Sequence, residues 1–349
     1  MSSASRFRLL LQRLNTFTSI PLTQTYYVDM GSTMTRVLVD GRVVFFEPTS
    51  LVIHKTTNSV IAVGKKATAL RGKLPQSLQL VQPVVRGHLQ NSSHGTAFLR
   101  TVLEREIHLR QKRTTLSQEV VLNKPCQMFE TYHQALKRVT SNASLLLKQT
   151  KDQPTAVFDW YKKQKKLSDQ ACILVIGGQV SEMSFISRGE TVLSQRIMFG
   201  GDDITRALQQ AVKQFHQIEI GWSAAEELKK DMITLDQTKT EQEIKHTVIK
   251  GKHVIENIPT TAKVASRSDQ WSMKEISQPS LGILTEGIEL FFQQMPPDLL
   301  STTLDTGIFL TGGGSQLTGL PGFLERVCHT EIITSQTPEI DVIQGLYVN

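Results

Sequence analysis

Three apolar runs along the chain each lead into glycine. Residues 26–30 precede Gly31, residues 172–176 precede Gly177, and residues 308–310 lead toward Gly312. Short apolar runs bounded by glycine predict buried strands. Because glycine has no Cβ, a strand that ends in it lets backbone N–H groups approach an anion closely. One such loop is equally compatible with an ordinary turn, but three in this order indicate a site for phosphate groups.

The segments after the first two glycine loops repeat one pattern. Residues 36–39 and 43–46 predict a hairpin, as do residues 184–186 with the turn that follows them. Other strands are predicted at 51–54, 60–63 and 120–122, and helices at 96–110, 130–147, 203–215, 223–232 and 281–294. The repeated order of strand, glycine loop and strand predicts a duplicated α/β domain with a cleft between its halves.

The length of 349 residues accommodates two such domains. We expect residues 21–168, completed by residues 325–349, to form the first. Residues 169–324 are expected to form the second, with a small β-rich subdomain inserted near 234–270, where the chain is polar and charged.

Residues 1–20 contain no acidic residue and predict a basic amphipathic helix. Its apolar face consists of Phe7, Leu10, Leu11, Leu14 and Phe17. Such a helix lies in the interface of an anionic membrane. The alternatives are that this face docks on the protein's own core, or that the segment is a targeting peptide.

Composition is that of an ordinary globular protein, with 39% hydrophobic residues and a formal net charge of +7. The charge favours contact with an anionic partner. The basic run at residues 162–166 lacks interleaved aromatic residues and predicts a solvated loop, so no nucleic-acid partner is expected. No apolar run reaches the roughly 18 residues of a transmembrane helix, and the three cysteines show no metal-ligand spacing.

Several stretches carry a resemblance to a known family. Residues 29–35, DMGSTMT, look like the first phosphate loop of the superfamily that contains actins, sugar kinases and heat-shock chaperone ATPases. Several further stretches resemble the MreB family in particular: residues 47–50, 62–65, 83–87, 124–126, 196–202, 225–229 and 310–317. The resemblance runs in collinear order from about residue 25 to residue 321 and implies the actin-like, ribonuclease H-like fold.

The resemblance implies a role for each glycine loop. Asp29 would position nucleotide-bound Mg²⁺ through water, and Gln153 would stand where the family places the residue that orients the attacking water. ATP would be held by Gly31, Ser32, Thr33, Met34, Gly177, Gly178, Gln179, Val180, Glu226, Glu227, Leu228, Lys229, Gly312, Gly313, Gly314 and Ser315. For the residues at 226–229, a solvated helix face is the alternative.

The second phosphate loop departs from the family's pattern, DIGGGTTE. Here it reads VIGGQVSE, so Val175 replaces an aspartate, Gln179 a glycine and Val180 a threonine. Gln153 replaces a glutamate, a change that actins tolerate, and Asn91 replaces an aspartate. Because phosphoryl transfer depends on metal placement and water orientation, we expect hydrolysis to be slow or absent.

The family resemblance implies a subunit of membrane-associated filaments on the inner face of the cell membrane, in the cytoplasm. Such subunits support cell shape and cell-wall organisation through self-association and contact with membrane proteins of the cell-wall machinery. A pseudo-actin that regulates another filament-forming protein is the alternative, which Val175 and Gln179 favour. A sugar or acetate kinase is disfavoured, because no catalytic aspartate or substrate-pocket signature is apparent.

Overall fold

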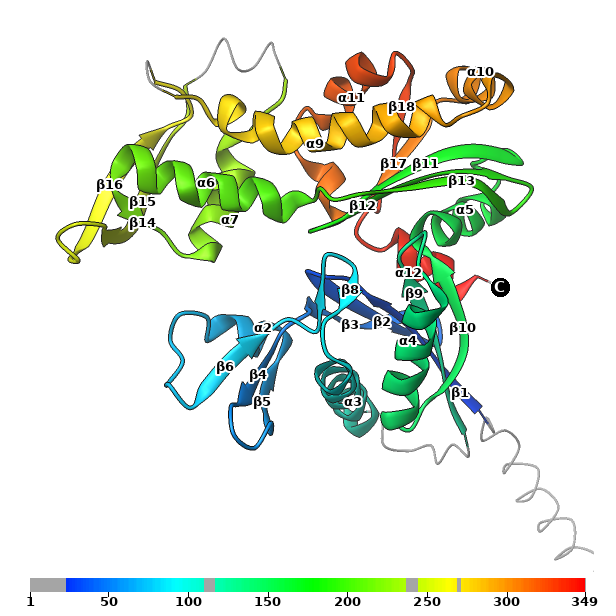
Figure 1. Ribbon diagram of the computed structural model, residues 1–349, viewed down its shortest axis with the longest axis horizontal. Helices are drawn as coiled ribbons and strands as arrows, with labels where there is room; N and C mark the ends of the chain where they lie inside the picture. The colour runs from blue at the N-terminus through cyan, green and yellow to red at the C-terminus, as the bar shows by residue number, and fades with distance from the viewer. Residues whose placement is uncertain (1–22, 110–116, 237–243, 269–270, 349) are drawn as a thin grey trace, which may run out of the picture.

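The computed structural model describes residues 23–109, 117–236, 244–268 and 271–348. Within these residues, two five-stranded sheets lie in separate halves of the molecule (Figure 1). The predicted membrane-facing side chains of Phe7, Leu10, Leu11, Leu14 and Phe17 lie outside the described residues.

The first sheet is built around β1, which ends at the first glycine loop. Its order is β10-β9-β1-β2-β3, with β1 antiparallel to β2 and parallel to β9. The strands are β1 (Thr23–Met30), β2 (Met34–Val39), β3 (Arg42–Pro48), β9 (Ser117–Lys124) and β10 (Leu146–Asp152). Helices α3 (Ser92–Leu109) and α4 (Glu130–Asn142) pack on this sheet and bury a core that includes Val28, Leu99 and Val139.

The second sheet repeats this arrangement around β11. Its order is β13-β12-β11-β17-β18, with β11 antiparallel to β12 and parallel to β17. The strands are β11 (Gln170–Ile176), β12 (Ser181–Ser187), β13 (Glu190–Ile197), β17 (Ile308–Thr311) and β18 (Ile332–Thr334). The two sheets therefore share one strand order, which is the duplication that the sequence pattern predicts.

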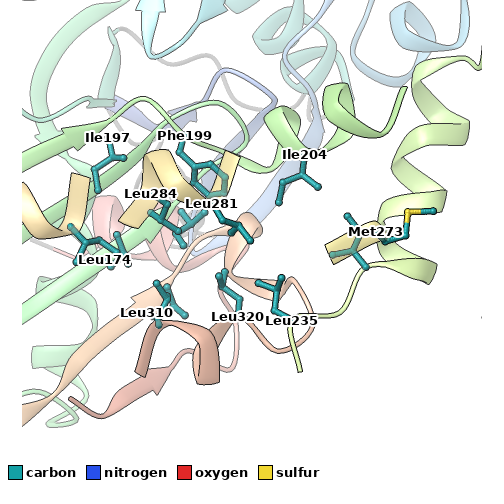
Figure 2. Packing of buried hydrophobic residues seen from close by; sticks show 14 of the residues in the cluster. Leu174, Ile197, Phe199, Ile204, Leu235, Met273, Leu281, Leu284, Leu310 and Leu320 are labelled. Atoms are coloured by element: carbon teal, nitrogen blue, oxygen red, sulfur yellow. The ribbon is translucent and has the colours of Figure 1, made fainter. Parts of the chain in front are cut away.

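The largest core lies where helices cover the second sheet. Figure 2 shows Leu281 and Leu284 of α9 beside Leu174 and Leu310 of the sheet. The helices of this half are α6 (Gly201–His216), α7 (Trp222–Met232), α9 (Met273–Gln293), α10 (Pro297–Thr306) and α11 (Leu320–Cys328). Burial of this apolar surface is the main force that holds the half together.

Two helices lie between the sheets. They are α5 (Gln153–Lys163) and α12 (Asp341–Tyr347), and their apolar residues join both sheets in a third core. The segment 325–349, which the sequence assigns to the first domain, divides here. Its strand β18 pairs with β17 of the second sheet, whereas α12 packs on α5 and β1.

Each half also carries a small sheet. The first has β4 (Leu51–His54), β5 (Val60–Val63) and β6 (Leu78–Val81) with α2 (Gly64–Ala69), and β7 (Val84–Val85) and β8 (His88–Leu89) pair beyond them. The second has β14 (Ile218–Glu219), β15 (His246–His253) and β16 (Pro259–Ala265), so the segment 234–270 contributes a β-hairpin.

The helix predicted over 130–147 is shorter in the structure. It ends at Asn142, and the chain then enters strand β10. Ser144 adopts a left-handed conformation with φ of 62°, and the Leu145 N–H donates to the Thr140 carbonyl at 2.9 Å. This is a Schellman ending, which usually requires glycine. The prediction was wrong because no glycine marks the stop.

Helix α9 begins earlier than the predicted residue 281. The hydroxyl of Ser272 accepts a hydrogen bond from the Glu275 N–H at 3.1 Å and caps the helix at its true start. Pro279 lies inside the helix. Proline is unusual in a helix interior because it lacks an N–H, so Pro279 gave no sign that the helix begins before residue 281.

Candidate functional site

A cavity of about 560 Å³ lies between the two halves. Its walls include the glycine loops that follow β1, β11 and β17. Cavities of roughly 300–1,000 Å³ hold small ligands and cofactors. The three loops that the sequence singled out therefore meet at one site of suitable size.

The first two loops have the same backbone turn. The Gly31 N–H donates to the Met34 carbonyl at 3.1 Å, and the Gly177 N–H donates to the Val180 carbonyl at 3.0 Å. The loops also touch, because a Cβ at Gly178 would lie 2.0 Å from the Thr33 hydroxyl oxygen. Glycine is thus required at position 178 by the close approach of the opposite loop.

The third loop requires glycine for its backbone conformation. Gly312 has φ of 90°, and a Cβ there would lie 2.4 Å from the Ile176 carbonyl oxygen. The Ser315 hydroxyl donates to the Gly312 carbonyl at 2.7 Å and fixes the turn. This loop therefore packs directly on the end of β11.

Helix α7 forms one wall of the cavity through Glu226 and Lys229. The Lys229 ammonium donates to Glu226 at 2.7 Å, to the Thr205 hydroxyl at 2.9 Å and to the Gly201 carbonyl at 3.1 Å. These bonds hold α7 against the start of α6 and fix the position of both charged side chains.

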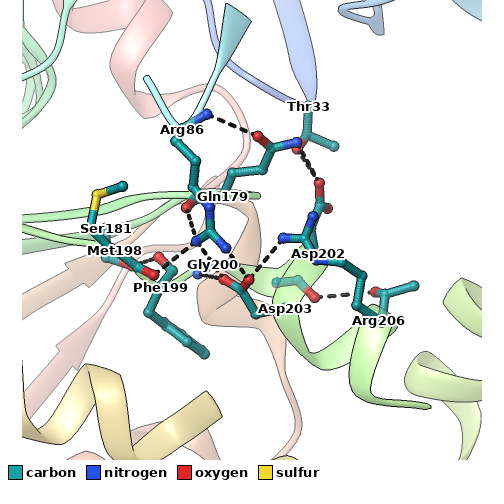
Figure 3. A network of polar contacts seen from close by, with 12 residues as sticks. Thr33, Arg86, Gln179, Ser181, Met198, Phe199, Gly200, Asp202, Asp203 and Arg206 are labelled. Atoms are coloured by element: carbon teal, nitrogen blue, oxygen red, sulfur yellow. Dashed lines mark hydrogen bonds and ion pairs between the residues drawn. The ribbon is translucent and has the colours of Figure 1, made fainter. Parts of the chain in front are cut away.

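Gln179 bridges the two halves. Its side-chain oxygen accepts from the Arg86 backbone N–H at 3.0 Å, and its amide nitrogen donates to Asp202 at 3.0 Å (Figure 3). Thr33 of the first half donates to the same Asp202 oxygen at 3.0 Å. The glutamine that replaces a glycine of the family pattern is buried, and it serves as a link across the cleft.

Arg86 makes the second set of links. Its guanidinium contacts both Asp203 oxygens, at 2.6 and 3.0 Å, and donates to the Met198 carbonyl at 2.8 Å (Figure 3). Its backbone φ is 52°, a conformation that costs a non-glycine residue about 1 kcal/mol. We call Thr33, Arg86, Gln179, Asp202 and Asp203 the cross-cleft network. Another contact between the halves joins Arg71 and Trp222, whose ring centre lies 5.3 Å from the guanidinium.

Asp29 forms an ion pair on the cavity wall. Arg36 stands opposite it in the register of β1 and β2, and its guanidinium lies 3.1 Å from the carboxylate. Burial raises the pKa of Asp29, and the charge and hydrogen bond of Arg36 oppose that rise. Asp29, which the resemblance assigns to water-mediated Mg²⁺ contact, thus has an arginine as its direct partner.

Gln153 and Glu182 also meet on the cavity wall. Gln153 begins α5 and donates to the Glu182 carboxylate at 3.4 Å, and the Cys126 N–H donates to it at 3.3 Å. Burial raises the pKa of Glu182 to about 8, and the negative charge of Asp152 adds to the rise. Glu182 is therefore a neutral carboxyl group over much of the acidic range.

The raised pKa of Glu182 predicts a pH-dependent stability. The folded chain keeps a proton on this group between its ordinary pKa of 4.5 and about 8, where the unfolded chain has lost it. The free energy of unfolding should therefore fall as the pH rises through that window, by roughly 1.4 kcal/mol per pH unit from this group. Glu182→Gln should remove this part of the slope in denaturant titrations, whereas Glu219→Gln, at an exposed position, should keep it. Equal slopes in all three proteins would contradict the shift.

The structure brings most of the predicted site residues together and leaves three aside. Predicted residues on the cavity wall are Asp29, Gly31, Ser32, Thr33, Met34, Gln153, Gly177, Gly178, Gln179, Val180, Glu226, Lys229, Gly312, Gly313 and Gly314. Leu228 is buried in the core, Glu227 is exposed, and Ser315 fixes the turn described above; none of the three belongs to the wall.

Several wall residues are not among those predicted from the sequence. They include Arg36, Asn123, Glu182 and Asp202. Arg36 falls within a predicted strand and belongs to no motif. Its contact with Asp29 arises only when β2 pairs with β1. Glu182 and Asp202 lie inside stretches that resemble the family, and that position was the available signal.

Membrane-spanning helices and clusters of metal-binding side chains are absent from the described residues. No helix among them has both the length and the apolar character needed to cross a membrane. Histidine, cysteine and acidic side chains nowhere gather, within those same residues, into a group of three that could hold a metal ion.

Duplicated sheets with one strand order, and glycine loops converging on a cleft between them, define an actin-like protein. The chain belongs to the MreB/Mbl family, because the family model of the MreB/Mbl protein matches residues 23–348. It is 22% identical to the cell shape-determining protein Mbl of Bacillus subtilis over 312 residues, 89% of this chain and 91% of the relative. It is 24% identical to the cell shape-determining protein MreB of Haemophilus influenzae over 323 residues, 91% of this chain and 90% of that protein.

Solved structures confirm the fold. MreB5 of Spiroplasma citri, bound to AMPPNP, superposes with a TM-score of 0.82 at 22% identity, covering 93% of this chain and 95% of that one. The MamK double helical filament gives a TM-score of 0.72 at 16% identity, covering 93% and 97%. The actin-like fold that the sequence predicted is confirmed.

Proposed function

We propose that this chain binds ATP in the cleft and assembles into filaments at the inner face of the cell membrane. There it supports cell shape and cell-wall organisation, with membrane proteins of the cell-wall machinery as partners. One observation carries the proposal: glycine loops from both duplicated halves converge on a cavity of about 560 Å³. MreB5 of Spiroplasma citri, solved with AMPPNP and with ADP, supports nucleotide as the ligand.

Self-association is supported by MamK, which shares the fold and was solved as a double helical filament. Membrane contact is supported by the predicted amphipathic helix in residues 1–20, whose apolar face has no acidic neighbour. Family membership supports the role in cell shape, because the MreB and Mbl relatives carry that description.

Slow or absent hydrolysis is part of the proposal. Val175 presents an apolar side chain to the cavity, where the family has an aspartate. Gln153 is hydrogen-bonded to Glu182. Valine at 175 can neither help hold a metal nor orient a water, and loss of one such contributor typically costs about 100-fold or more in rate. Glutamine at 153 is tolerated in actins, so the two changes together, rather than Gln153 alone, support slow hydrolysis.

A second function, a pseudo-actin that regulates another filament former, is favoured by the cross-cleft network. Gln179 and Arg86 join the halves through protein groups alone. A subunit whose two halves are joined by its own side chains depends less on bound nucleotide to keep the cleft closed. The two functions differ in whether the purified chain assembles by itself.

Sedimentation of the purified full chain tests the proposed function. With ATP, we expect most of the protein to pellet above a critical concentration and filaments to be visible by electron microscopy. Protein that binds ATP but stays in the supernatant would contradict filament formation and support the pseudo-actin. Protein that neither binds ATP nor sediments would overturn the proposal.

The same assay with lipid vesicles tests membrane contact. Vesicles that contain phosphatidylglycerol should carry the protein with them, and neutral phosphatidylcholine vesicles should carry less. Leu11→Ser alters the predicted apolar face and should weaken binding severalfold, whereas Leu9→Ser alters the opposite side of the predicted helix and should have a smaller effect. Equal effects of the two changes would contradict the predicted helix.

A further inference from the structure

Arg36 is a fixed cation on the wall of the proposed nucleotide cleft. It pairs with Asp29 at 3.1 Å, and its guanidinium lies 4.7 Å from the ring centre of Phe46, its register partner on β3. The side chain is 11% exposed. Its Nε is buried and has no hydrogen-bond partner among the described residues. The guanidinium is thus held in place on two sides while a donor remains unused.

The carboxylates of the cleft do not fit a nucleotide-bound Mg²⁺. The Arg36 guanidinium pairs with Oδ2 of Asp29 and offsets the charge of this carboxylate, and position 175, where the family has the second aspartate, is valine. The two other buried acids on the wall are also engaged: Glu182 accepts from Gln153 and Cys126, and Asp202 accepts from Thr33 and Gln179. Magnesium is usually bound through one or two carboxylates together with phosphate oxygens. Direct coordination of a metal by Asp29 would have to break this buried ion pair, which is costly. A water-mediated contact would meet a carboxylate whose charge Arg36 already offsets.

We propose that Arg36 takes the place of the divalent cation, so that the cleft binds the phosphates of free ATP without Mg²⁺. This inference rests on the proposed nucleotide binding and specifies the charge state of the ligand. A guanidinium is always protonated and presents its donors in a planar fork that matches phosphate oxygens. Asp29 engages only Nη1 of the guanidinium, so terminal N–H donors remain for phosphate oxygens.

The position of Arg36 agrees with this role. Its partner Asp29 is the residue before the last of β1, close to the loop whose N–H groups are expected to meet the phosphates. The loop and the guanidinium therefore lie on the same wall of the cavity. A cation built into the chain also orients phosphates without arranging a water for attack, which is consistent with slow hydrolysis.

Calorimetric titration of the full chain with ATP, in excess Mg²⁺ and in excess EDTA, tests the inference. We expect binding in EDTA to be at least as tight as binding with Mg²⁺. Arg36→Gln should weaken binding in EDTA by about tenfold or more, because it removes a charge-assisted contact with phosphate. It should also release Asp29, so that Mg²⁺ now tightens binding by the variant.

Arg42→Gln is the matched control, since Arg42 is exposed on the neighbouring strand β3 and lies outside the cavity wall. Its affinity should equal that of the unaltered chain in both buffers. Binding by the unaltered chain only when Mg²⁺ is present would overturn the inference and leave the proposed function standing. No binding in either buffer would overturn both. Because this comparison needs only the unaltered chain, a misfolded variant would not prevent the test.

Discussion

Arg86→Met is expected to lower the free energy of unfolding by about 2–4 kcal/mol and to let the two halves move apart. The substitution removes the charge-assisted bonds from the guanidinium to Asp203 and to the carbonyls of Met198 and Gln179. It also leaves the largely buried carboxylate of Asp203 with fewer positively charged partners. Denaturant titration measures the stability, and small-angle X-ray scattering measures the radius of gyration, which should increase.

Arg206→Met is the control for this prediction. Arg206 pairs with the same carboxylate at 2.8 Å, but both residues lie on α6, so the pair does not cross the cleft. Because this pair is more exposed, its loss should cost under about 1 kcal/mol and leave the radius of gyration unchanged. If the two variants behaved alike, the cross-cleft network would not hold the halves together.

Gly345→Ala should have the second large effect, a loss of about 3 kcal/mol in the free energy of unfolding. A Cβ at Gly345 of α12 would lie 1.8 Å from the Ala156 carbonyl oxygen of α5. The contact is between backbones, so neither helix can yield by turning a side chain. Since both helices lie between the sheets, the strain would act on the joint that connects the halves.

Gly282→Ala provides the matched control in another helix. Gly282 lies in α9, and a Cβ there would meet no atom within 4 Å. Alanine should therefore stabilise the helix by up to about 1 kcal/mol through its higher propensity. Thermal or denaturant unfolding of the two variants should give opposite signs, and a stable Gly345→Ala protein would contradict the packing of α12 on α5.

Local patterns were sufficient to predict the glycine loops and the duplication. An apolar run that ends at glycine specifies a strand and a turn within a few residues, as β1, β11 and β17 confirm. The helix boundaries were missed at Ser144 and Pro279, where the structure uses residues that seldom occupy those positions.

The partners of charged groups could not be predicted, because they depend on register and on contacts between distant segments. Gln179 was recognised as a departure from the family pattern, yet its bonds to Arg86 and Asp202 arise only when the halves close. Glu182 acquires its raised pKa through burial beside Asp152, which another strand contributes. These contacts decide what the site does chemically.

The central proposal is that this chain is a nucleotide-binding filament subunit with impaired hydrolysis. It is tested by identifying the nucleotide that sedimented protein contains. Protein incubated with ATP is pelleted, and the pellet is extracted and separated by chromatography at several times. We expect about one nucleotide per subunit, with ATP predominating throughout. Conversion of the bound ATP to ADP as soon as the filaments form, or a pellet without nucleotide, would contradict the proposal.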